Sequence, residues 1–239
     1  MPVVSLFGRR QKRVDVPRVK SRREAQVVVN RVDFAEMAPE SMPYLGQAAY
    51  LQLAIFETLS RAMANAPSTE AKEALSRAAG LSLAKHHALA AEIAKKGKEP
   101  GAAMAPYAER IDSFARLTAG ADWYETLLTS YVTSGLLDDF YRSLADGLPG
   151  DASATVRKIF SGDDGHDLIA TELRNAIDAN PHLASRLAMW GRRLVGDTLL
   201  VARSALSERG HRDEARLEPV FTELISAHTR RMDALGLTA

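Results

Sequence analysis

Residues 43–65, PYLGQAAYLQLAIFETLSRAMAN, carry the pattern on which the fold prediction depends. Apolar side chains recur there at steps of three and four, at Ala48, Leu51, Ile55, Leu59 and Met63. This spacing is typical of a helix with one apolar face. Pro67 cannot continue a helix, and Ser68 or Thr69 can cap the next one. The stretch therefore predicts a helix that ends near residue 65 and buries one face.

The same periodicity recurs along the chain and predicts five further helices. Their approximate ranges are 69–96, 121–146, 152–178, 182–208 and 213–235. A segment that contains glycine and proline, GKEPGAAMAPYAERIDSF (97–114), is expected to link the second helix to the third. Alternation with period two never persists, so almost no sheet is expected. The sequence thus predicts an all-α protein, with two helix hairpins that form a four-helix bundle and two additional C-terminal helices.

The first 40 residues differ from the rest of the chain. They contain three prolines, a short β-branched run over residues 25–34, and a dense basic segment in which Asp15 is the one acid before Glu24. The basic residues are Arg9, Arg10, Lys12, Arg13, Arg18, Lys20, Arg22 and Arg23. We interpret residues 1–40 as a basic, mostly irregular N-terminal arm and residues 41–239 as the helical domain. Such an arm could bind nucleic acid, the ribosome or an anionic membrane surface, or could remain a solvated tail.

Composition narrows the chemistry available to the protein. The chain has no cysteine, which excludes disulfides and thiolate metal sites, so any metal would need His, Asp or Glu ligands. No apolar run approaches the roughly 18 to 20 residues of a membrane span, and the N-terminus lacks the apolar core of a signal peptide. We therefore expect a cytoplasmic protein without a transmembrane segment. The bundle could also pair with a second copy as a homodimer.

Two hairpins joined by a long crossover resemble the ferritin-like bundle. There, metals lie between a Glu on each of two helices and an acid-x-x-His pair on each of the other two. Asp163 and His166 match such a pair, with Asp in place of Glu, and Glu57 matches the lone acid of the first helix. On the third helix, Asp138 or Asp139 could supply a carboxylate, and Ser134 could equally mark a lost one.

The second helix departs from this pattern. No acid stands three residues before His86 or His87, and one turn earlier the ligand positions hold Ser82 and Lys85, whose ammonium would repel a metal. His86 would join the site only from a shifted register, and otherwise it is a partly buried histidine. Asp163 and His166 could likewise form a metal-free pair, or SGDDGHD (161–167) could be a kink. The candidate metal residues Glu57, His86, Asp139, Asp163 and His166 are therefore predicted to be vestigial.

Five segments resemble those of a known group. They are YLQLAIFETLSRA (50–62), GAAMAPY (101–107), DDFYRSLA (138–145), RLAMWGRRLVGD (186–197) and AHTRRMDALGL (227–237). Over residues 43–236 the chain resembles actinobacterial ferritin-like proteins related to the MiaE-like tRNA hydroxylases. The resemblance implies a ferritin-like bundle and, in members that keep the site, a di-iron centre that activates oxygen.

Because ligands are missing, we expect a non-catalytic member with a degenerate di-metal site and no cofactor. It would act by binding, with the bundle as a platform and the basic arm as an anchor. The alternative is a di-iron hydroxylase of the MiaE-like type, with iron held by residues drawn from Glu57, His86, Asp138 or Asp139, Asp163 and His166.

Overall fold

The computed structural model describes residues 40–207 and 214–238, with side chains described outside 201–220. These residues form helices and no strand. Helix α1 spans Ser41–Ala64, α2 Thr69–Lys95, α3 Pro100–Leu117 and α4 Trp123–Leu144. A short 3-10 turn, η2 (Ala145–Gly147), is followed by α5 (Asp151–Phe160), α6 (His166–Ala179), α7 (Pro181–Ser207) and α8 (Glu214–Ala234). The all-α prediction is confirmed for these residues. Apart from Glu40, the predicted basic arm lies outside the described residues.

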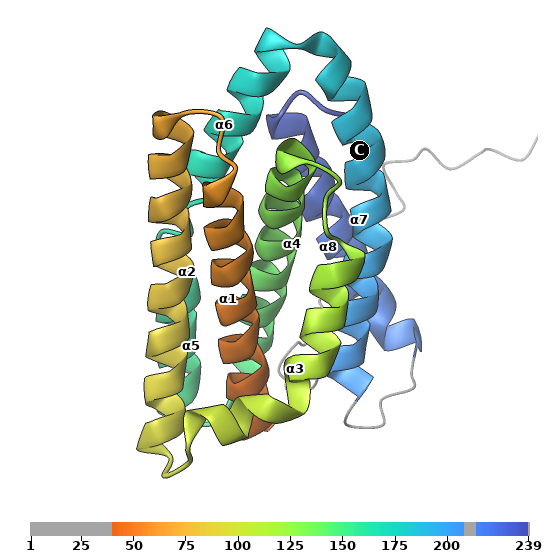
Figure 1. Cartoon of the computed structure of the whole chain (residues 1–239). Coiled ribbons are helices and arrows are strands. Elements are labelled where there is room, and N and C mark those ends of the chain that lie inside the picture. Colours follow the sequence, from red (N-terminus) through yellow and green to blue (C-terminus); the bar gives the residue numbers. More distant parts are fainter. Residues whose placement is uncertain (1–39, 208–213, 239) are drawn as a thin grey trace, which may run out of the picture. The chain divides into compact units, whose positions relative to one another are not determined.

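Helices α1, α2 and α4 run side by side, and the fourth position of the bundle is shared by α5 and α6 (Figure 1). Helix α3 packs along α1, and α7 packs on α4. The helix starts follow from local chemistry. Ser68 accepts a hydrogen bond from the Ala71 backbone N–H at 3.1 Å, and Asp122 accepts one from that of Glu125 at 2.9 Å. Both side chains thereby satisfy a backbone donor that has no partner within the helix.

The core is built around α4, which is buried on every side between residues 127 and 138. The largest side chains packed in the core include Tyr44, Leu59, Leu75, Ile93, Leu136 and Phe140. Several polar groups share this environment. A buried polar group is costly unless it has a partner, so these residues mark the place to look for a site. No described helix is long and apolar enough to cross a membrane.

The predicted linker over residues 97–114 is wrong, because most of it forms helix α3. Pro100 occupies the first turn, where its missing N–H costs nothing, and the Glu99 carboxylate caps the helix through the Ala102 N–H at 2.8 Å. Tyr107, Ile111 and Phe114 recur at steps of three and four and are buried. The Gly and Pro residues conceal this apolar face from a reading that treats them as breakers.

The single helix predicted over residues 152–178 is also wrong. The chain breaks at residues 161–165, between α5 and α6. Gly165 has φ = 72°, and a Cβ there would lie 2.8 Å from the Ala78 Cα on α2. Asp163 and Asp164 each accept a backbone N–H two residues ahead, from Gly165 and His166. The stretch SGDDGHD is therefore the kink that the sequence left open as an alternative.

Candidate functional site

A buried ion pair links α2 to α4 in the bundle core. The Lys85 ammonium lies 2.6 Å from Oδ2 of Asp138, and both residues are less than a tenth exposed. The other oxygen of Asp138, Oδ1, accepts a hydrogen bond from Nε2 of Gln52 on α1 at 2.7 Å. The Lys85 nitrogen also lies 6.0 Å from the centre of the Phe160 ring. Each oxygen of the carboxylate thus has a donor from a different helix, which offsets the cost of burying it.

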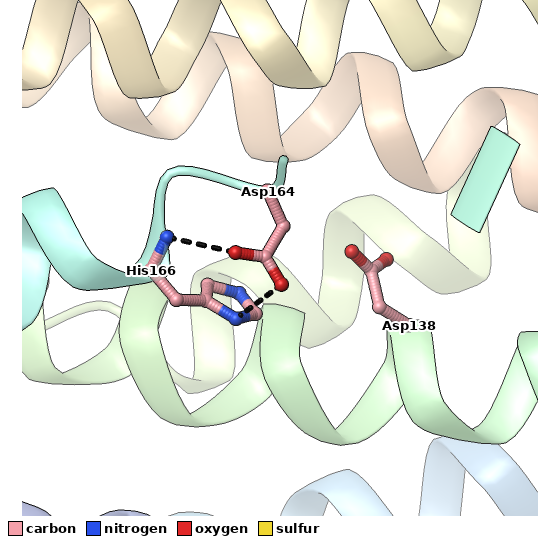
Figure 2. A group of neighbouring side chains, drawn as sticks. All are labelled: Asp138, Asp164 and His166. Carbon is pink, nitrogen blue, oxygen red and sulfur yellow. Dashed lines mark hydrogen bonds and ion pairs between the residues drawn. The ribbon is translucent and has the colours of Figure 1, made fainter. Parts of the chain in front are cut away.

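Beside this pair, the turn before α6 brings Asp164 onto His166 (Figure 2). Oδ1 of Asp164 accepts the His166 backbone N–H at 3.0 Å, and Oδ2 lies 2.9 Å from the ring nitrogen Nδ1. The second ring nitrogen, Nε2, lies 2.8 Å from Oγ of Ser134. The Tyr131 ring packs edge-on against the imidazole, with 5.9 Å between centroids. His166 is therefore held by α4 on one side and by its own turn on the other.

The contacts of Ser134 constrain the hydrogen-bond direction at His166. The Ser134 hydroxyl lies 2.5 Å from the Ser130 carbonyl, which can only accept, so the single hydroxyl hydrogen points there. Nε2 must then donate to the Ser134 oxygen, while Nδ1 donates to Asp164. All these contacts are satisfied when the ring of His166 carries both protons.

The charge of Asp164 is stabilised by its neighbours. Burial alone would raise the pKa of this carboxyl, but the hydrogen bonds and charge of His166, with the charge of Lys85, hold the pKa well below its ordinary value. Asp138 and Asp164 are thus matched by Lys85 and His166. We call these four side chains, together with Gln52, the lysine cluster.

Three members of the lysine cluster could also act as metal ligands. Asp138, Asp164 and His166 each place one ligand atom within 4.8 Å of the others. The donor set nevertheless does not fit a di-iron centre. Two irons require carboxylates from several helices, whereas α1 contributes the amide of Gln52 and α2 contributes the ammonium of Lys85. Both ring nitrogens of His166 are already engaged as well.

Helix α2 turns toward the core the two residues that the sequence placed at its ligand positions, Ser82 and Lys85. Ser82 and Lys85 are both buried, at 5% and 6% exposure. The Ser82 hydroxyl bonds back to the Ala78 carbonyl at 3.4 Å. His86 instead places Nδ1 2.9 Å from the Ala49 carbonyl, and His87 is exposed. The histidine pair therefore lies outside the lysine cluster.

Of Glu57, His86, Asp139, Asp163 and His166, the structure brings only His166 into the lysine cluster, and Asp138, the alternative to Asp139, joins it. Glu57 is about half exposed and pairs with Arg61 at 3.3 Å. Gln52, which lies about 140° away around the helix, is the residue of α1 that faces the site. Asp139 pairs with Arg142 and with Arg231, at 2.5 Å each.

In two places the acid that reaches the site is the sequence neighbour of the predicted one. Asp138 and Asp139 differ by about 100° around α4, so only the first faces α2. Asp163 is exposed in the turn, and Asp164 contacts the imidazole in its place. The helix break explains this exchange, because the i, i+3 rule that favoured Asp163 applies only within a continuous helix.

Sequence reasoning missed Gln52 as the contribution of α1. A signal for it exists: Gln52 lies seven residues after Leu45 and seven before Leu59, two residues that are fully buried. Two turns of helix return to nearly the same face, so this spacing places Gln52 on the buried stripe.

Comparison with known proteins agrees with this architecture. A family model described as "Ferritin-like domain, actinomycetes" matches residues 39–215. No curated protein matches the chain. The matched segment runs from α1 to the first residues of α8 and includes every residue of the lysine cluster. The chain therefore belongs to the family of actinomycete ferritin-like domains.

Proposed function

We propose that this protein is a ferritin-like protein whose di-metal site has been replaced by the lysine cluster, and that it acts by binding rather than by oxygen activation. The observation that carries the proposal is the 2.6 Å contact between Lys85 Nζ and Asp138 Oδ2. An ammonium and an iron ion compete for the same carboxylate oxygen. Because like charges repel strongly at low dielectric, iron could use Asp138 only after Lys85 had lost its proton or moved away.

Charge balance within the cluster supports the same conclusion. A ferritin-like di-iron site draws four carboxylates and two histidines from its helices. Here there are only two carboxylates, and each has a donor beside it, the Lys85 ammonium on Asp138 and the His166 ring on Asp164. Less negative charge is therefore available to attract a divalent cation. The cluster instead ties α1, α2, α4 and the start of α6 together, which suits a rigid platform.

The basic residues between Arg9 and Arg23 are the proposed anchor of this platform. Eight cations close together in sequence attract a polyanion such as nucleic acid, a ribosomal surface or an anionic membrane. A cytoplasmic location, and assembly as a homodimer, stay predictions from the sequence.

Iron analysis of the full-length protein tests the replacement of the metal site. The protein is purified aerobically from an iron-supplemented culture and measured by elemental analysis and absorption spectroscopy. We expect a colourless protein with well under one iron per chain. Stoichiometric iron with near-ultraviolet absorption from an oxo bridge would overturn the proposal. The same preparation treated with chelator and then Fe²⁺ distinguishes lack of affinity from loss of metal during purification.

A di-iron hydroxylase of the MiaE-like type is the second candidate. It is favoured by one observation, the convergence of ligand atoms from Asp138, Asp164 and His166 within 4.8 Å. This candidate requires Lys85 to leave Asp138 when metal enters. Stoichiometric iron in the experiment above would select it.

A further inference from the structure

A cavity of about 480 Å³ lies between α1, the C-terminal half of α3 and α4. Its apolar wall includes Leu51, Ile55, Ile111, Phe114, Trp123 and Leu137. The volume is about three times the ~150 Å³ that accommodates a benzene molecule, and it falls in the range of small-molecule sites. No residue of the lysine cluster lines this cavity. The cavity is therefore a second candidate site in the bundle, separate from the lysine cluster.

The cavity has a closed end and an open end. Leu51 and Leu137, at 3% and 1% exposure, form part of the closed end. Arg61 and Asn65, on the last turns of α1, are exposed and lie at the open end. A bound molecule would thus place one part among apolar side chains and the other part near solvent.

The hydroxyl groups in the wall have no hydrogen left for a ligand. Five of them, on Thr58, Thr118, Thr126, Ser130 and Thr133, donate to the backbone carbonyl four residues earlier. The Thr129 hydroxyl donates to the Thr118 carbonyl, and Trp123 Nε1 donates to the Ala62 carbonyl. Because a hydroxyl carries a single hydrogen, an acceptor group buried in the cavity would remain unpaired. The inner part of a suitable ligand is therefore hydrocarbon.

The open end favours a negative group. Arg61 is two-thirds exposed, and its 3.3 Å pair with the half-exposed Glu57 is of the weak surface kind. Asp122, the acid among the lining residues, is already engaged by Arg186 and by the Glu125 backbone N–H. The guanidinium of Arg61 is thus the charge that an incoming group would meet.

We infer that this cavity binds an amphipathic carboxylate, with its hydrocarbon chain between α1, α3 and α4 and its carboxylate at Arg61. Benzene has six non-hydrogen atoms and fits a cavity of about 150 Å³, so a cavity about three times as large admits up to about 18 such atoms. Medium-chain fatty acids fall within this limit, so dodecanoate is a suitable probe. The inference does not depend on the lysine cluster, and the iron measurement does not bear on it.

Tryptophan fluorescence provides a direct test, because the chain has only two tryptophans and they differ in position. Trp123 lines the cavity, whereas Trp190 does not line it and donates to Thr129 from α7 at 2.9 Å. The full-length protein is titrated with 2-bromododecanoate, whose bromine quenches a nearby indole. We expect saturable quenching that persists in Trp190→Phe and disappears in Trp123→Phe. Absence of saturable quenching in the unmodified protein, or quenching that persists in Trp123→Phe, overturns the inference.

Cavity-filling variants test the location independently of the tryptophans. Ala115→Phe places a ring in the cavity from α3, and the matched control Ala105→Phe changes an exposed position of the same helix. We expect binding of dodecanoate, measured by calorimetry, to weaken at least tenfold in the first variant and to stay unchanged in the second. Ala54→Phe fills the cavity from α1 and serves if Ala115→Phe does not fold. Unchanged affinity in a folded filling variant overturns the inference.

The head group is tested with Arg61→Gln and two ligands. Loss of an exposed charge pair should weaken dodecanoate binding about two- to fivefold and leave dodecanol binding unchanged. Arg77→Gln, at an exposed position on α2 outside the cavity, is the control. Equal effects of Arg61→Gln on the acid and the alcohol would overturn the assignment of Arg61 to the carboxylate.

Discussion

Lys85 on α2 and Asp138 on α4 form an ion pair in the core, with 2.6 Å between Nζ and Oδ2. Ferritin-like bundles that bind metal present their ligands from facing helices in the core, and Asp138 belongs to the group of possible ligands in this core. In the function proposed above, the Lys85 ammonium takes the place that a metal ion would occupy. Removal of Lys85 and its replacement by an acid test two consequences of this arrangement.

Removal of Lys85 should destabilise the protein strongly. In Lys85→Met, Asp138 keeps its hydrogen bond from Gln52 but loses its cation. A buried charge left without its partner costs about 3–5 kcal/mol, measured as the free energy of unfolding in urea. Lys95→Met is the control, because Lys95 is 70% exposed and pairs with Glu92 at the surface. A loss below about 1 kcal/mol in Lys85→Met would show that the pair is not needed to neutralise Asp138.

Replacement of Lys85 by an acid should create metal affinity. Lys85→Glu removes the competing ammonium and adds a carboxylate beside Asp138, Asp164 and His166. We expect Zn²⁺ or Fe²⁺ to raise the melting temperature of this variant, since a ligand at about 100 times its Kd stabilises a protein by about 2.7 kcal/mol. Lys85→Gln, which lacks the new charge, should respond less. An equal response in the unmodified protein would contradict the role given to the ammonium.

Stability should fall between pH 6.5 and pH 4 because of His228 on α8. This side chain is 3% exposed, and burial, with a smaller effect of Arg231, lowers its pKa from 6.5 to about 4. In this window the unfolded chain binds a proton that the folded protein does not, so the free energy of unfolding decreases as pH falls. The loss is at most about 3 kcal/mol. The window lies above pH 3.8, the ordinary pKa of an aspartate such as Asp164.

Urea unfolding at pH 7 and pH 4.5 measures this effect. The difference between the two pH values should shrink in His228→Gln and persist in His182→Gln, which changes an exposed histidine. A pH dependence that is identical in all three proteins would exclude His228 as the source.

Gly165 should tolerate no side chain, because it has φ = 72° and a Cβ there would meet Ala78 at 2.8 Å. We expect Gly165→Ala to lower the free energy of unfolding by about 2–3 kcal/mol, from backbone strain together with overpacking. Gly97→Ala is a matched control, because Gly97 has φ = 73° but open space around it. Backbone strain alone should lower the free energy of unfolding of this control variant by about 1 kcal/mol. Similar losses in the two variants would mean that the contact with α2 adds nothing.

The anchor role of the N-terminal residues predicts a change in binding to polyanions. Removal of residues 1–23 deletes the eight basic side chains between Arg9 and Arg23. We expect weaker binding to RNA or to anionic vesicles and a shallower salt dependence, because fewer counterions are released. Filter binding and vesicle sedimentation at two salt concentrations measure both. Equal affinities for the full-length and shortened chains would dismiss the anchor.

Much of the fold follows from the sequence, because helical periodicity is a local property. The stripe from Ala48 to Met63 predicts α1, and turn signals at Pro67 and Pro181 delimit its neighbours. The same local reasoning failed at α3, where Pro100 starts a helix instead of preventing one. It also predicted that Lys85 opposes metal binding, because a lysine ammonium is recognisable from the residue type alone, and this stays a prediction.

Tertiary structure alone decided which polar residues meet. Asp138 and Asp139 are chemically identical neighbours, and only the packing of α4 against α2 turns the first toward Lys85. The break that selects Asp164 over Asp163 exists because the chain approaches Ala78 too closely for any residue but glycine. The residue types and helices of this protein were therefore readable one segment at a time. Its site depends on which face each helix turns inward and on how closely segments far apart in sequence pack. Neither property can be read from a single segment.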